Sequence, residues 1–406
     1  MKRLLIYSHD TFGLGNIRRI MNVATYLLDA IPDLSILIVT GSPMIHSFRI
    51  PKRLDYIKLP CLSRTEREGY SVKYLDTDTS DILRLRSELI LSTTLSFKPD
   101  VVMIDKKPLG VKHELRQTFE ALQHSLPSTR CILLLRDILD TPESTTKVWR
   151  DNGYFDAVRS LYDLVLVLGL PDLFDPRTEY SFPLSVSEKV EFCGYVQPQG
   201  RLTDREVIRR QLQLSNRDQM VLVTVGGGED GYSLLRTYTN ALRQLPASAS
   251  FHSVIVTGPE MSASQRSLVQ QCAASHRNVR LLEFTNDLVS HMNAADLVVA
   301  MGGYNTVCEI LSLRKPAIIV PRARPVEEQW IRAERMSCMG LFTAIHPDKL
   351  NPMDLMRQIL AKLNPTAKTH PFIDMTALPV LAGHVARLLN SEFVPLVAGN
   401  VCREPL

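Results

Sequence analysis

Residues 298–311 read VVAMGGYNTVCEIL, and the order of residue types in this stretch indicates the fold. An apolar run suited to a buried strand ends in a glycine pair, and a helical pattern begins at once with Asn305 and Thr306. Glu309 is the one acid of the stretch and comes about one turn into that helix. Strand, glycine turn and helix in this order are typical of an α/β protein with a helix-covered parallel sheet.

The same rhythm continues along most of the chain. Short Val/Ile/Leu-rich runs predict strands at 3–7, 34–40, 101–105, 131–137, 163–169, 220–228, 253–259, 279–284, 296–303 and 316–322. Amphipathic stretches predict helices at 16–30, 112–125, 143–160, 231–244, 262–275, 288–295, 304–314 and 327–338. The expected fold class is therefore α/β, with two Rossmann-like doubly wound domains facing each other across a cleft.

A change of composition marks the expected domain boundary. Gly, Pro and Gln gather at 194–204, and Thr203 with Glu206 has the spacing of a capping box. We expect an acceptor-side domain over 1–195 and a donor-binding domain over 203–370. A last helix and tail would follow over 371–406, with packing back on the first domain left open.

Composition excludes several classes of protein. A net charge of +4 over 406 residues is too small to favour nucleic-acid binding. The seven cysteines are scattered without a CxxC pair, which favours reduced thiols in a cytoplasmic protein over a disulfide framework or a zinc site. No run approaches the ~18 apolar residues of a membrane span, so we expect at most peripheral membrane contact, at the inner face.

Four loops that follow predicted strands carry glycine, which lets a phosphate approach backbone amides at a helix N-terminus. They lie at 8–16, 226–231, 257–259 and 300–306. The spacing in 8–16 is not GxGxxG, so the dinucleotide fingerprint is absent. An ordinary strand-to-helix turn explains 257–259 equally well.

The longer stretch 284–329, FTNDLVSHMNAADLVVAMGGYNTVCEILSLRKPAIIVPRARPVEEQ, carries a family resemblance. It resembles the two-domain GT-B nucleotide-sugar glycosyltransferases, above all family 28, which includes the UDP-N-acetylglucosamine transferase that makes the lipid-linked murein precursor. The shared parts are a Phe-containing loop, "AAD", an apolar strand, a glycine turn, "T..E.L", "KP.I..P" and an acidic-glutamine cluster. The resemblance covers the C-terminal half well and the N-terminal half mainly in its first loop.

The resemblance implies a donor site. Phe284 and Thr285 would lie near the uracil, and Glu309 would accept hydrogen bonds from the ribose hydroxyls. Gly302, Gly303, Asn305 and Thr306 would meet the diphosphate, and Glu328 and Gln329 would bind the transferred sugar. Gly15 belongs to the first loop, which in this family lies near the donor phosphate. The glycine loops themselves add Gly226, Gly227, Gly228 and Gly258 as candidate phosphate contacts. From the residues alone, Glu309 could instead be a surface acid that complements a helix dipole, and Gln329 an ordinary polar helix position.

The first loop leaves the catalytic base open. The family commonly has histidine after the last glycine of this loop, and here that position is Asn16, which cannot act as a general base. His9 and Asp10 are the nearby substitutes, with a loop-stabilising polar role as the alternative for His9. Arg18 and Arg19 would either hold an acidic acceptor or lie on an exposed helix face.

The resemblance implies no metal and no cofactor beyond the UDP-sugar donor. The Asp-x-Asp at 76–78 is better explained by Asp78 or Ser80 as a helix N-cap than by a metal site. Residues 60–82 resemble an acceptor-side insertion, which leaves a lipid-linked and a soluble acceptor both open.

The expected activity is transfer of a hexose or N-acetylhexosamine from a UDP-sugar to an acceptor hydroxyl with inversion. A first alternative is a UDP-sugar 2-epimerase or hydrolase, for which His9, Asp10, Glu229 and Asp230 supply acids and a base. A second alternative is a non-catalytic homologue that keeps the nucleotide-sugar pocket.

Overall fold

The computed structural model describes residues 1–9, 14–64, 69–245, 250–364, 372–390, 392 and 393. The chain divides into two compact units. Unit 1 contains residues 1–196 and the described residues from Thr376 onward, and unit 2 contains the described residues of 197–375.

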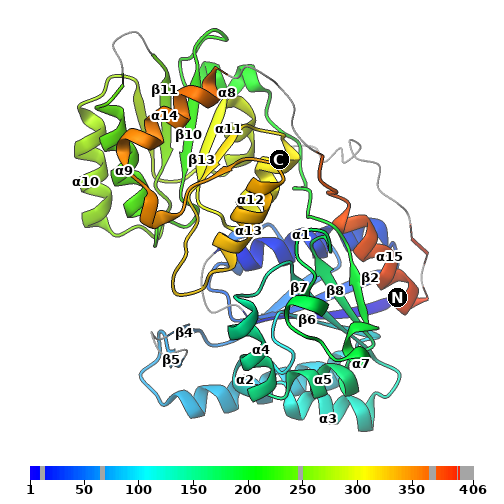
Figure 1. The fold of residues 1–406 in the computed structure, drawn as a ribbon. Helices are drawn as coiled ribbons and strands as arrows, with labels where there is room; N and C mark the ends of the chain where they lie inside the picture. The colour runs from blue at the N-terminus through cyan, green and yellow to red at the C-terminus, as the bar shows by residue number, and fades with distance from the viewer. Residues whose placement is uncertain (10–13, 65–68, 246–249, 365–371, 391, 394–406) are drawn as a thin grey trace. The chain divides into compact units, whose positions relative to one another are not determined.

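Unit 1 is built on a parallel sheet of seven strands in the order β3-β2-β1-β6-β7-β8-β9 (Figure 1). The strands are β1 (Lys2–Ser8), β2 (Leu34–Thr40), β3 (Leu54–Lys58), β6 (Val101–Asp105), β7 (Arg130–Arg136), β8 (Leu164–Leu168) and β9 (Val190–Phe192). Most of their Val, Ile and Leu side chains are almost fully buried, as expected for a sheet covered on both faces, whereas Leu37, Ile57 and Leu164 are half-buried. Because the chain order reverses between β1 and β6, the carboxyl ends of these two strands form a topological switch point.

The helices of unit 1 follow the predicted pattern with two exceptions. They are α1 (Leu14–Ala30), α2 (Thr79–Phe97), α3 (Arg116–Ser125), α4 (Pro142–Asp151), α5 (Tyr154–Leu161), α6 (Pro176–Glu179), α7 (Leu184–Ser187) and α15 (Ala377–Leu389), with short 3₁₀ turns at Ile45–Ser47 and Val111–His113. The helix predicted over 112–125 begins only at Arg116, because Lys112 and His113 have positive φ values of 47° and 63°. The single helix predicted over 143–160 is wrong. Gly153 has a left-handed φ of 65°, which glycine adopts readily, and it separates α4 from α5.

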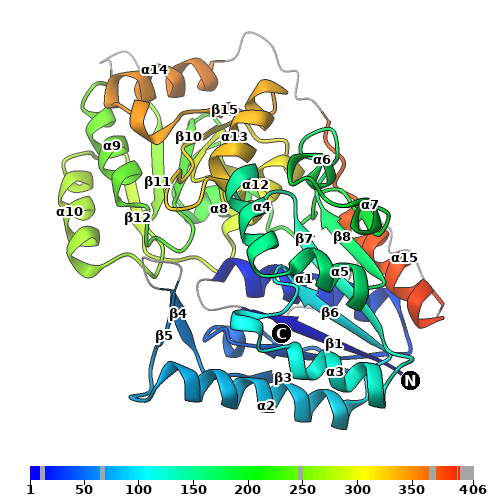
Figure 2. The ribbon, with the colours of Figure 1, turned by 60° about the horizontal axis from the view of Figure 1, so that its bottom comes forward.

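The polar region 60–82 holds more regular structure than the sequence indicated. An antiparallel hairpin joins β4 (Leu62–Arg64) to β5 (Tyr70–Val72). Asp78 occupies the N-cap position of α2, although its side chain makes no capping hydrogen bond. Figure 2 shows α2 and α3 side by side in this unit.

Unit 2 repeats the architecture with a parallel sheet of six strands in the order β12-β11-β10-β13-β14-β15. The strands are β10 (Met220–Thr224), β11 (His252–Val256), β12 (Val279–Leu282), β13 (Leu297–Ala300), β14 (Ala317–Ile319) and β15 (Thr343–Ala344). The two-residue β15 was not predicted. The switch point of this sheet lies between β10 and β13, whose carboxyl ends are adjacent through the pair Thr224 and Ala300.

The helices of unit 2 cover this sheet. They are α8 (Arg205–Gln211), α9 (Tyr232–Leu242), α10 (Ala263–Ala274), α11 (Leu288–Ala294), α12 (Tyr304–Ser312), α13 (Glu328–Cys338) and α14 (Pro352–Leu363), with a 3₁₀ turn at Pro347–Lys349. α9 packs against α10 and α14, and α11 packs against α8 and α12 (Figure 1).

The capping box predicted at Thr203 is wrong in its first residue. Asp204 is the N-cap of α8, and its carboxylate accepts a hydrogen bond from the Glu206 amide. The Thr203 hydroxyl instead donates to Asp287, the N-cap of α11, at 2.7 Å. The two neighbouring helix starts are thereby joined.

The last described helix, α15, belongs to unit 1 and packs against α1. Thr376, the residue before this helix, forms an isolated antiparallel bridge with Val196. Among the described helices, none combines the length and the apolar character needed to cross a membrane.

Candidate functional site

Loops that lie far apart in the sequence meet at the carboxyl edge of the sheet in unit 2. The Arg322 guanidinium, after β14, donates to the Asp230 carboxylate, after β10, at 2.9 Å. The Arg322 amide donates to the Gln329 side-chain oxygen at 3.1 Å. The structure therefore brings the glycine loop at 226–231 together with Gln329, and the glycine turn at Gly302 also touches Gln329.

The two glycines of this turn have different surroundings. A Cβ added at Gly302 would lie 2.9 Å from the Pro321 Cβ and 3.3 Å from the Gln329 Cβ, so packing requires glycine there. A Cβ added at Gly303 would meet no atom within 4 Å, and its φ of −60° suits any residue. Packing therefore explains Gly302, whereas at Gly303 the space beside the backbone is open.

Gly303 is also the N-cap of α12 and provides no side-chain cap. The first amides of a helix have no carbonyl partner within it, and the helix dipole favours an anion beside them. Asn305 and Thr306 lie half-buried in this first turn. Glu309, one turn further, is only 3% exposed, so the alternative of a surface acid is wrong.

Arg332 is a residue of this region that the sequence analysis missed. Its side chain is fully buried, donates to the Gly302 carbonyl at 3.1 Å and lies over the Tyr304 ring at 5.5 Å. Its guanidinium is 3.9 Å from the buried Glu328 carboxylate. The four-residue spacing of Glu328 and Arg332 on a helix was the available signal, but such pairs usually lie on solvated faces.

Gly228 and Gly258, in the loops after β10 and β11, have a packing explanation, whereas a Cβ added at Gly226 would meet no atom within 4 Å. Gly228 and Gly258 both have positive φ, at 103° and 83°. A Cβ at Gly258 would lie 2.3 Å from the Gly227 carbonyl oxygen, and one at Gly228 would lie 2.4 Å from the Thr257 carbonyl oxygen. The loops after β10 and β11 therefore interlock backbone against backbone, which accounts for these glycines without a ligand.

Phe284 lies in the loop after β12 and is 52% exposed, an unusual position for a large aromatic side chain. The neighbouring Thr285 hydroxyl accepts from the Asp287 amide at 3.2 Å, which fixes the loop at the start of α11. The loop thus presents an exposed ring on a rigid support.

At the switch point of unit 1, three buried ionisable side chains lie together. His9, directly after β1, is 8% exposed, and its Nδ1 lies 3.5 Å from the carboxylate of Asp105 at the end of β6. Arg19 is 2% exposed and donates to the other oxygen of Asp105 at 2.8 Å. Arg19 also donates to the Asn16 side-chain oxygen at 3.3 Å, so Asn16 supports this network.

Burial sets the protonation of this network. It lowers the pKa of His9 to about 4, so the imidazole is neutral near pH 7. Burial alone would raise the pKa of Asp105, but the Arg19 charge and His9 hold it well below its usual range. A neutral imidazole beside a carboxylate can accept a proton, since the carboxylate stabilises the imidazolium that forms.

Several predictions for the first loop change with the structure. Arg19 neither holds an acceptor nor lies on an exposed face, because it is buried on Asp105. Asp105 ended a predicted strand and was not recognised as a site residue. Gly15 is exposed in the first turn of α1, and Asp10 lies outside the described residues.

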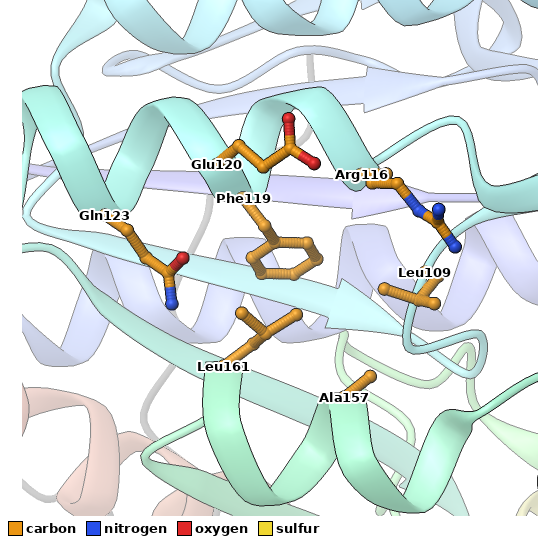
Figure 3. Close-up of a pocket in the computed structure, with 7 residues that line it drawn as sticks. All are labelled: Leu109, Arg116, Phe119, Glu120, Gln123, Ala157 and Leu161. Atoms are coloured by element: carbon orange, nitrogen blue, oxygen red, sulfur yellow. The ribbon is translucent and has the colours of Figure 1, made fainter.

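A further hollow of about 300 Å³ lies between α3 and α5 of unit 1 (Figure 3). Its floor is apolar, formed by Leu109, Phe119, Ala157 and Leu161, with Arg116, Glu120 and Gln123 at its rim. It contains none of the predicted site residues. Within the described part of the chain, no group of three or more His, Cys, Asp or Glu side chains could hold a metal ion.

Comparison with known sequences gives a family match that covers most of unit 2. Residues 220–378 match the glycosyltransferase family 28 C-terminal domain. The chain is 26% identical over 242 residues to an uncharacterized glycosyltransferase of Methanopyrus kandleri, covering 58% of this chain and 64% of that protein. It is also 26% identical over 193 residues to the UDP-N-acetylglucosamine–N-acetylmuramyl-(pentapeptide) pyrophosphoryl-undecaprenol N-acetylglucosamine transferase of Haemophilus influenzae, covering 46% of this chain and 52% of that protein. The matches thus span between half and two thirds of these relatives.

Solved structures show the same two-domain fold. MurG of Acinetobacter baumannii superposes with a TM-score of 0.59 and 15% identity over 96% of this chain and 99% of its own. A putative UDP-N-acetylglucosamine 2-epimerase of Listeria monocytogenes reaches 0.65 with 13% identity over 98% and 100%. MnaA of S. aureus, solved with UDP, reaches 0.62 with 14% identity over 96% and 97%. The chain therefore has the GT-B fold.

Proposed function

Because residues 220–378 match the glycosyltransferase family 28 C-terminal domain and the chain has the GT-B fold, we propose that the chain is a glycosyltransferase. It moves a hexose or N-acetylhexosamine from a UDP-sugar to an acceptor hydroxyl, with inversion at the anomeric carbon. The observation that carries this proposal is the open space beside the Gly303 backbone at the start of α12, with buried Glu309 one turn further along.

In this proposal the carboxyl edge of unit 2 binds the donor. The diphosphate approaches the backbone at Gly303, where no side chain stands in its way and the helix dipole favours its charge. Glu309 accepts hydrogen bonds from the ribose hydroxyls, and the exposed Phe284 ring packs beside the uracil. Gln329, which the Arg322 amide holds in place, contacts the sugar. Backbone donors fixed before the reaction would stabilise the departing UDP.

Unit 1 supplies the base in the same proposal. The neutral His9 ring takes the proton from the acceptor hydroxyl, and Asp105, held by Arg19, orients the imidazole and stabilises its charged form. The acceptor oxygen then attacks the anomeric carbon opposite the UDP leaving group. Asn16 contributes through Arg19 rather than by taking a proton.

A product assay tests the proposal. Purified protein is incubated with UDP-, GDP- and TDP-sugars, first alone and then with soluble and polyprenyl-diphosphate-linked acceptors. The proposal predicts that UDP is released only when an acceptor is present. It also predicts that, of the three classes of donor, only UDP-sugars react.

Other outcomes of the same assay identify the alternatives. A new UDP-sugar formed without acceptor would identify an epimerase, a class whose putative Listeria member shares this fold. Free sugar formed without acceptor would identify a hydrolase. Binding of UDP without turnover across the panels would identify a non-catalytic homologue.

A further inference from the structure

The contacts of Arg332 suggest a role that the donor-site residues named above do not include. Arg332 lies on α13, and its fully buried guanidinium donates to the carbonyl oxygen of Gly302 in the turn before α12. A buried guanidinium is costly unless its donors are satisfied. Its contacts include that carbonyl, the Tyr304 ring and the Glu328 carboxylate. Gly302 lies in the turn, and Tyr304 is the first residue of α12.

The geometry of one peptide bond connects Arg332 to the open side of the turn. The Gly302–Gly303 peptide is trans, since the cis bond in the described residues is Arg324–Pro325. In a trans peptide, the carbonyl and the following N–H point in opposite directions. Because Arg332 holds the Gly302 carbonyl toward the protein interior, the Gly303 N–H points away from it.

The two glycines of this peptide also differ in their surroundings. Gly302 is closed in by Pro321 and Gln329, whereas nothing lies within 4 Å of a Cβ built at Gly303. A glycine turn would otherwise be free to rotate its peptide, because glycine tolerates many backbone conformations.

We infer that Arg332 is a positioning residue that fixes the Gly302–Gly303 peptide, so that the Gly303 N–H is aimed at a diphosphate before the ligand arrives. This inference rests on the proposed function, because it specifies how the same site recognises the leaving group. Arg332 acts through the Gly302 carbonyl and does not touch the ligand.

The test compares two ligands that differ only in the diphosphate. Dissociation constants for UDP and for uridine are measured by calorimetry or ligand-observed NMR for the wild-type chain, Arg332→Met, Arg332→Lys and the control Arg335→Met on the same helix. We expect Arg332→Met to weaken UDP binding about tenfold or more and uridine binding less than about twofold. Arg332→Lys, which keeps the charge and a donor, should recover part of the UDP affinity. Arg335→Met should match the wild type.

Each other outcome has a defined meaning. Parallel weakening of UDP and uridine, or no weakening of either, overturns the inference, because a purely structural arginine would not distinguish the two ligands. If Arg332→Met does not fold, Arg332→Lys is compared with the wild type instead. A ratio of UDP affinity to uridine affinity that equals the wild-type ratio would then overturn the inference. A wild-type chain that binds no UDP overturns the proposed function itself, and the inference with it.

Discussion

The two units place different chemistry at equivalent positions of the same topology. At the switch point of unit 1, the side chains of His9, Asp105 and Arg19 form a buried charged network. At the switch point of unit 2, glycine backbone lies against a helix start, and the charged side chain of Arg332 stands behind it. The difference teaches that one fold can offer side chains for proton transfer and backbone amides for anion binding, depending on which residues follow the strands.

The largest effect on stability is expected when the network of His9, Asp105 and Arg19 in unit 1 is broken. Arg19→Met would leave the Asp105 carboxylate buried without its closest cation. Removing one partner of a buried ion pair costs about 3–5 kcal/mol, which chemical denaturation would measure as a lower free energy of unfolding. The neighbouring half-buried Arg18, changed to Met, is the control and should cost far less. Equal losses in the two variants would show that the Arg19–Asp105 pair does not stabilise unit 1.

The next largest effect is the pH dependence that His9 gives to the free energy of unfolding of unit 1. Its folded pKa is about 4, below the ordinary value of 6.5, so the unfolded chain binds more protons between these values. The free energy of unfolding therefore falls as the pH drops from about 6.5 to about 4, by about 3 kcal/mol at most. His9→Asn should flatten this dependence in denaturation series at several pH values. The exposed His124, changed to Asn, is the control and should leave the dependence unchanged.

A smaller effect concerns the ribose contact proposed for unit 2. Glu309→Gln keeps the shape of the buried side chain and removes its charge. A charge-assisted contact is worth about 1–3 kcal/mol, so UDP affinity should fall about 5- to 150-fold. The control ligand is 2′,3′-dideoxy-UDP, which lacks the ribose hydroxyls, and its binding is measured by calorimetry. The wild type should bind it more weakly than UDP, whereas the variant should bind both ligands with nearly the same affinity. A variant that still discriminates fully between them would contradict the role of Glu309.

The smallest effect separates the two glycines of the turn. Gly303→Ala adds a methyl group in open space, so the melting temperature should stay unchanged while UDP affinity falls by about 1–2 kcal/mol. Gly302→Ala forces the new methyl group against Pro321 and should lower the melting temperature. The reverse pattern, with Gly303→Ala unstable and Gly302→Ala unaffected, would contradict the distinction between a packed and an open glycine.

Sequence patterns predicted the central strands of both sheets, because a buried parallel strand needs a continuous apolar run. The edge strands β3 and β9 were not predicted, because β3 mixes polar and apolar residues and β9 has only three residues. The run at 34–40 became β2 with the same bounds. The two-residue β15 was too short to leave a pattern. The break between α4 and α5 depends on the single left-handed residue Gly153, which an otherwise helical pattern concealed.

The candidate site was predicted only in part, for a physical reason. Gly303 and Glu309 belong to one contiguous stretch, so their spacing could be read directly. The pair of Arg19 and Asp105 is separated by 86 residues, and nothing local in the sequence shows that two strand ends will bring such charges together. Arg332 was missed because an arginine on a helix is expected to be solvated, and its burial depends on packing against the glycine turn.

Hydrogen exchange with and without saturating UDP tests the central claim most directly, because it reports on each backbone amide of the turn. We predict that UDP slows exchange chiefly in the peptide that covers Gly302 to Glu309, and that Gly303→Ala reduces this protection. Protection that is absent from this peptide, or is confined to the strand ends at His9 and Asp105 in unit 1, would contradict the assignment of the donor site to unit 2.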